Sequence, residues 1–125
     1  MKLKPDLQVW WRQAARDFSS ARNSLLSRDY YVCALLCQQA VKKALKYIHL
    51  QKAEGLLRTH DLVKLAKEVS APVEIIQKCS EINPIYIEVR YPEGSELPAS
   101  KVNKQEAEYL LKLTSEILRW VKKQH

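Results

Sequence analysis

The sequence predicts an all-α domain, folded as an up-and-down bundle of four to five helices. Three observations carry this prediction. Only two of the 125 residues are glycine, 46% are hydrophobic and few are aromatic, a composition that favours helices over strands. Residues 30–50 form a long run with a single helical period. The length suits one domain, residues 1–125, with a core of its own.

The run at residues 30–50 has the strongest pattern in the chain. Apolar or small side chains recur every three or four residues, which places them along one face of an α-helix. Its apolar opening is too short to cross a bilayer, so we expect a core helix and no membrane span. The predicted buried stripe is Cys33, Ala34, Cys37, Ala40, Val41, Ala44, Leu45 and Ile48. The polar residues that fall mostly off this stripe are Gln38, Gln39, Lys42, Lys43, Lys46 and His49.

A first helix is predicted before this run, over residues 6–27. The short polar connection at residues 27–29 predicts that the two helices lie antiparallel. Residues 51–59, which include Gly55, are predicted to form a loop. The expected inner face of the first helix is Trp11, Ala14, Phe18, Ala21 and Leu25, joined by Val9 or Trp10 and by Ala15.

Two shorter helices are expected next. The first opens at residues 59–61, with Thr59 or Asp61 as its cap, and runs to about residue 69. The second begins near Pro72, which the first turn of a helix tolerates. Asn83-Pro84 either ends or kinks it. Its expected buried side is Val73, Ile76, Ile82 and Ile85 or Tyr86.

A last helix is predicted from about Asn103 to residue 123. Asn103 is a good N-cap, and Glu106 stands three residues further on, as in a capping box. The irregular segment before it, residues 90–102, holds three of the chain's breaker residues, and long loops are often functional. The expected core stripe of the last helix is Ala107, Leu110, Leu111, Thr114, Ile117, Leu118 and Val121.

Charge and cysteine content narrow the partners and the compartment. The net charge of +7 permits binding to nucleic acid or nucleotides, although the lysines are scattered over every segment. The N-terminus carries no secretory signal, so the cytoplasm is the expected location. Cys33, Cys37 and Cys79 are an odd number without ligand spacing, which indicates reduced, buried thiols and neither a metal site nor a cofactor.

Three pieces of the chain, taken in order, resemble the HEPN superfamily. They are DYYVCALLCQQAVKKALK at residues 29–46, His60-Asp61-Leu62 at the start of the third helix, and Tyr86 followed by Arg90-Tyr91-Pro92. The resemblance implies a helical bundle that forms a homodimer, with the loop after the penultimate helix near the two-fold axis. It also implies a role beside a small nucleotidyltransferase or in a toxin–antitoxin pair.

Many proteins of this superfamily are metal-independent ribonucleases, which use an arginine followed four to six residues later by a histidine. Arg90 fits the arginine, but the positions for the histidine hold Ser95, Glu96 and Leu97. Without an imidazole no side chain in the loop suits proton transfer near neutral pH. We therefore lean against an enzyme and name no catalytic residue. The alternatives are a degenerate ribonuclease, in which Arg90 cooperates with His60 or His125, and a pure interaction subunit.

The residues expected to bind a nucleotide or RNA are Arg90, Tyr91 and Tyr86, because a guanidinium can clamp a phosphate while tyrosines stack on a base. Gln39, Lys43 and His60 are further candidates. Each also has a structural interpretation. Arg90 could pair with Glu88 or Glu93, while His60 and the two central glutamines could make hydrogen bonds within the fold. In the interaction-subunit alternative, Trp10 or Trp11 offers an exposed surface to a partner protein.

Overall fold

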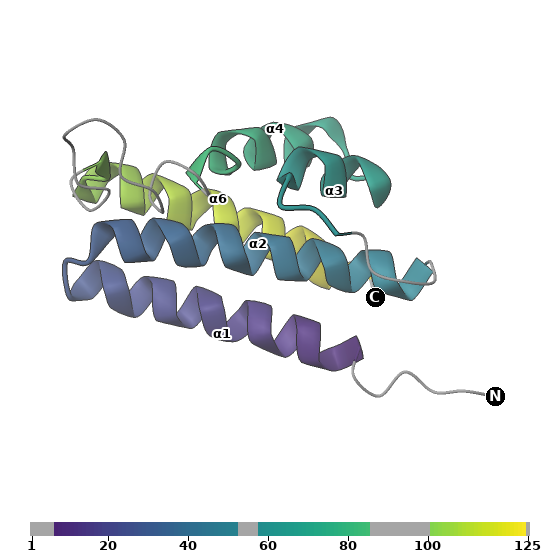
Figure 1. Cartoon of the computed structure of the whole chain (residues 1–125), viewed down its shortest axis with the longest axis horizontal. Helices are drawn as coiled ribbons and strands as arrows, with labels where there is room; N and C mark the ends of the chain where they lie inside the picture. Colours follow the sequence, from purple (N-terminus) through teal and green to yellow (C-terminus); the bar gives the residue numbers. More distant parts are fainter. Residues whose placement is uncertain (1–6, 53–57, 86–100, 125) are drawn as a thin grey trace.

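The computed structural model describes residues 7–52, 58–85 and 101–124. These residues form helices joined by turns, and no strand occurs among them. Figure 1 shows α1 and α2 side by side and antiparallel, α6 along α2, and the short pair α3 and α4 over the same bundle. The all-α prediction is confirmed. The described helices are α1 (Leu7–Leu26), α2 (Tyr30–Lys52), α3 (Leu62–Glu68), α4 (Val73–Ile82) and α6 (Lys104–Lys122).

Helix α2 is the centre of the bundle, and it contacts every other helix among the described residues. All eight residues of its predicted stripe are completely buried, and Tyr47 joins them. The prediction for its polar residues was wrong at two positions: Gln38 is completely buried, and Lys46 is 7% exposed. Because helices pack around α2 on several sides, they also cover polar residues that lie beside its apolar stripe.

Helix α1 packs on α2 through a narrower face than expected. Ala14 and Ala21 are completely buried, as predicted. Of the alternatives Val9 and Trp10, Trp10 is half-buried against the core and Val9 is exposed, while Ala15, also expected inside, is exposed. Asp17 takes a place on that face and is only 6% exposed. A carboxylate at such a position needs a partner, because burying a charge without one is costly.

Two helices end on residues in the left-handed region, where glycine is usual. Arg28 after α1 has φ 68° and Ser70 after α3 has φ 59°. The amide of Asp29 donates to Ser24 O at 2.8 Å, and the amide of Ala71 donates to Ala66 O at 2.9 Å. Each amide bonds the carbonyl five residues earlier, as in a Schellman motif, and so satisfies a carbonyl that the helix end would leave without a partner. Both helices therefore have this C-terminal cap without a glycine.

The starts of α3 and α6 are capped as the sequence predicts. Of the two candidates before α3, Asp61 is the cap, and its carboxylate accepts from the amides of Val63 and Lys64 at 3.0 and 3.2 Å. Asn103 and Glu106 form the capping box of α6, with bonds of 2.8 and 2.9 Å. Both helices therefore begin where these side chains place them.

The buried face of α4 differs from the prediction. The helix ends at Ile82, and Asn83 and Pro84 form a turn. Val73 is 68% exposed and Ile76 is half-buried, whereas Ile82 and Ile85 are buried as expected. Tyr86 lies outside the described residues. The face that packs inward is Ile75, Cys79 and Ile82, spaced by four and three. In α6 the core stripe includes Leu113 in place of Leu111, which is half-buried.

The three cysteines are buried and unpaired, as predicted. Burial raises the pKa of the Cys79 thiol to about 12. Among the described residues no group of histidine, cysteine and acidic side chains could hold a metal ion. None of the described helices combines the length and the apolar character needed to cross a bilayer.

Candidate functional site

Arg90, Tyr91 and Tyr86, the main predicted binding residues, lie outside the described residues. The structure does describe both ends of the segment that carries them. Ile85 precedes this segment and Lys101 follows it, and both line one hollow of about 260 Å³. The two described residues that flank 86–100 therefore lie close to one another on the bundle.

This hollow, between the end of α4 and the start of α6, combines apolar and polar walls. The hydroxyl of Tyr109 donates to Glu81 Oε1 at 2.6 Å, and this bond raises the pKa of Tyr109 above its ordinary value. The ring of Tyr109 remains 46% exposed, so it offers an aromatic surface beside an amine and two carboxylates. The lining residues are Glu81, Pro84, Ile85, Lys101, Val102, Glu106, Tyr109 and Leu110.

A second hollow, of about 500 Å³, lies between the start of α3 and the end of α4, and His60 is on its rim. Asn83 holds the two helices together there. Its Oδ1 accepts from the Leu62 amide at 2.8 Å, and its Nδ2 donates to Asp61 Oδ1 at 3.0 Å. Pro84 lines both hollows, so the two hollows meet at the end of α4.

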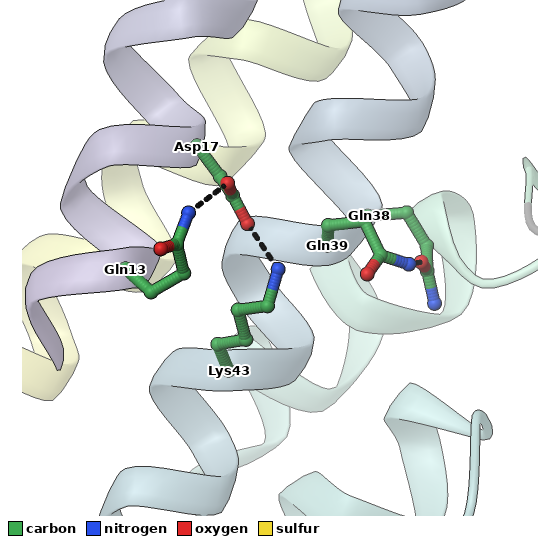
Figure 2. A network of polar contacts seen from close by, with 5 residues as sticks. All are labelled: Gln13, Asp17, Gln38, Gln39 and Lys43. Carbon is green, nitrogen blue, oxygen red and sulfur yellow. Dashed lines mark hydrogen bonds and ion pairs between the residues drawn. The ribbon is translucent and has the colours of Figure 1, made fainter. Parts of the chain in front are cut away.

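Lys43 and Gln39 are placed elsewhere, in the polar network of Figure 2. The Lys43 amine donates to Asp17 Oδ2 at 2.5 Å across the α1–α2 contact. Gln13 donates to Asp17 Oδ1 at 2.8 Å. The Gln39 amide donates to Gln38 Oε1 at 2.7 Å. The charge of Lys43 is thus neutralised within the bundle, and Lys43 and His60 line separate hollows.

Sequence analysis missed Asp17, although a signal was present. Asp17 follows Ala14 by three residues and precedes Ala21 by four, so it falls on the small-residue face that packs against α2. The amide nitrogen of Gln38 is also buried, and it has no hydrogen-bond partner among the described residues. The residue types alone do not predict that Asp17 and Gln38 are buried, because their burial depends on which helix packs against them.

The two adjacent tryptophans of α1 are half-buried, and both pack against the core. The Trp11 ring lies 6.1 Å from that of Tyr47, tilted by 37°. The Lys46 amine lies 6.0 Å from the centre of the Trp10 ring. Among the described residues, the large hydrophobic side chains that are exposed are Val9, Leu26, Val73 and Tyr109.

Fold and hollows together define a small helical-bundle domain whose candidate binding segment joins the fourth helix to the last. The family model described as HEPN domain matches residues 7–124, so the chain belongs to the HEPN family. The structure is similar to the crystal structure of TT1696 from Thermus thermophilus, with TM-score 0.88 and 27% identity, covering 96% of this chain and 98% of that one.

A second similar structure is ST0689, described as an archaeal HEPN homologue. Its TM-score is 0.80 and its identity 29%, covering 99% of this chain and 98% of that one. No curated protein matches the chain. These likenesses agree with the sequence resemblance and span nearly the whole domain.

Proposed function

We propose that this protein is a non-catalytic HEPN module that binds a nucleotide or RNA through Arg90, Tyr91 and Tyr86. The observation that carries the proposal is that Ile85 and Lys101, the described residues on either side of 86–100, line one hollow. The hollow that Ile85 and Lys101 line also contains the exposed Tyr109. A guanidinium binds phosphate by paired hydrogen bonds, and aromatic rings stack on bases.

Binding is proposed in place of catalysis because the ribonuclease pattern is incomplete. Ser95, Glu96 and Leu97 occupy the positions of the expected histidine. A hydroxyl and an unshifted carboxylate are poor groups for moving the proton of a 2′-hydroxyl near pH 7.

A degenerate ribonuclease is the second candidate, favoured by one observation. His60 lines a hollow that shares Pro84 with the hollow of Ile85 and Lys101, the described residues on either side of 86–100. Incubation with an RNA ladder separates the two functions. Cleavage that is lost in both Arg90→Ala and His60→Ala supports the enzyme, and intact RNA at high protein concentration supports binding alone.

Arg90→Ala is the direct test of the binding proposal. We expect about a tenfold or larger loss of affinity for nucleotide or short RNA, because each 1.4 kcal/mol of lost interaction is a factor of ten. Isothermal titration at two salt concentrations measures it. Arg12→Ala is the matched control, since Arg12 is an exposed arginine of α1 without a hydrogen bond or ion pair to the described residues. Equal affinity of Arg90→Ala and the wild type would refute this assignment.

The proposal includes a homodimer and a nucleotidyltransferase partner in the cytoplasm. Light scattering of the purified protein measures the mass, for which we expect twice the 14.5 kDa of one chain. A nucleotidyltransferase encoded beside this protein should co-purify with it, and a monomer that captures no such protein would contradict this part.

A further inference from the structure

Tyr109 and Glu81 form a fixed pair in the hollow between α4 and α6. The two residues come from different helices, and the Tyr109 hydroxyl donates to Glu81 Oε1 at 2.6 Å. This bond raises the pKa of Tyr109, so the hydroxyl keeps its proton and stays the donor. The Tyr109 ring is nevertheless 46% exposed. An accessible aromatic ring therefore has a carboxylate held at its hydroxyl end.

The Glu81 carboxylate keeps acceptor capacity for a ligand. An ionised carboxylate can accept about four hydrogen bonds, and the bond from Tyr109 uses one of them, at Oε1. No ion pair among the described residues involves Glu81. Glu106, a second carboxylate of this hollow, accepts from the Asn103 amide at 2.9 Å in the capping box, so it has a structural task. Glu81 is the acceptor that a ligand on the Tyr109 ring would reach.

The hollow suits a flat ring better than a phosphate group. Its volume of about 260 Å³ lies just below the roughly 300–1,000 Å³ of pockets for drug-sized molecules, so one small group fits. Apolar side chains form part of its wall, namely Pro84, Ile85, Val102 and Leu110. Among the described lining residues, two carboxylates stand against one lysine amine, and this balance repels an anion. A nucleobase combines apolar faces with a polar edge, as these walls require.

The hydrogen-bonding pattern of Glu81 selects among the bases. A carboxylate only accepts, so it favours an edge that carries donors side by side. The Watson–Crick edge of guanine has two adjacent donors, N1–H and the 2-amino group. Adenine and cytosine place a ring nitrogen acceptor beside their single amino group, and uracil has one N–H between two carbonyls. An acceptor that faces the carboxylate is repelled, so guanine is the base that matches.

We propose that this hollow binds a guanine base, which stacks on the Tyr109 ring and donates its N1–H and 2-amino group to Glu81. The inference rests on the proposed function, because the base belongs to the nucleotide or RNA proposed there. It adds a preference that phosphate contacts and stacking do not provide, since neither distinguishes one base from another. The hydroxyl of Tyr109 positions the carboxylate, while its ring contacts the base.

Isothermal titration of the full chain with GMP, IMP and AMP tests the preference. IMP keeps the N1–H of guanine and lacks the 2-amino group, whereas AMP presents an acceptor at N1. We expect GMP to bind about tenfold more tightly than AMP, because a pair of matched hydrogen bonds discriminates bases by at least this factor. The affinity for IMP should lie between the two.

Variants of the pair assign the preference to its residues. Glu81→Gln should lower the affinity for GMP to that for AMP, and Glu74→Gln is the matched control, an exposed glutamate of the same helix outside the hollow. Tyr109→Phe keeps the ring and loses the bond to Glu81, so it should reduce the GMP preference and retain AMP binding. Tyr109→Ala should weaken both nucleotides about tenfold, because it removes the stacking surface. Glu81 and Tyr109 are exposed, and circular dichroism checks that each variant folds.

Arg90→Ala separates this inference from the proposed function. It should weaken GMP and AMP by the same factor and leave their ratio unchanged. Equal affinities for GMP and AMP, both lowered in Arg90→Ala, would overturn the guanine site while leaving the proposed function in place. A GMP preference that survives in Glu81→Gln would also overturn it. If none of the three nucleotides binds, both the guanine site and nucleotide binding by this chain are refuted.

Discussion

The pair Asp17–Lys43 gives the sharpest stability prediction. Asp17 is 6% exposed, and its partner Lys43 retains 23% exposure of its side chain. Lys43→Met leaves the carboxylate buried with one remaining donor, the amide of Gln13. Removing one partner of a fully buried pair costs roughly 3–5 kcal/mol. Because Gln13 stays and the site is partly open, we expect about 2 kcal/mol here.

The opposite substitution should cost less. In Asp17→Asn the Lys43 amine can turn to water, so we expect about 1 kcal/mol. For a 125-residue domain the entropy of unfolding gives about 4 °C per kcal/mol, so the melting temperature should fall by about 8 °C in Lys43→Met and about 4 °C in Asp17→Asn.

Thermal and urea unfolding followed by circular dichroism measure both effects, with Lys67→Met as the control for loss of an exposed lysine. The double variant Asp17→Leu/Lys43→Met should be more stable than Lys43→Met alone, because it leaves no orphaned charge. The reasoning is refuted if Asp17→Asn costs more than Lys43→Met, or if the double variant is no more stable than Lys43→Met alone.

Two more predictions concern the α4 region. The Cys79 thiol keeps its proton to about pH 12 in the folded chain, against an ordinary value of 9.0, so the unfolded chain releases protons first and stability falls as pH rises from 9 to 12. Cys79→Ala should reduce the fall of the free energy of unfolding with pH by up to about 1.4 kcal/mol per pH unit. Urea unfolding at pH 8.5, 9.5 and 10.5 measures this, and an equal pH dependence of the wild type and Cys79→Ala would contradict the raised pKa. Asn83→Ala should lower the free energy of unfolding by about 1–2 kcal/mol, because the Leu62 amide loses its acceptor. Asn23→Ala, at an exposed position on α1, is the control in urea unfolding, and equal stability of the two variants would contradict a stabilising role for the Asn83 bond.

The parts of the fold that depend on local chemistry could be predicted from the sequence. Asn103 with Glu106 and Asp61 before α3 fix helix starts through bonds to nearby amides, so their residue types suffice. The stripe of α2 was correct because one long helix with eight small or apolar positions has a single face to bury. The face of α4 was not, because Val73 and Ile75 are equally apolar and only the packing partners choose between them.

The residues of the candidate site also differ in how far the sequence could predict them. The spacing of Asp17 from Ala14 and Ala21 indicates its face, but its partner Lys43 and the contact of Lys46 with Trp10 depend on how α1 packs on α2. Asn83 looked like a helix stop, while its bonds to the start of α3 shape the hollow at His60. The binding role of Arg90 stays a prediction, since it lies outside the described residues.

The common anchoring of Ile85 and Lys101 also bears on how such a domain changes over time. When both ends of a segment are held at one place, doubling its length costs only about 0.6 kcal/mol of closure entropy. Insertions or deletions between these two anchors should therefore change the free energy of unfolding of the bundle little.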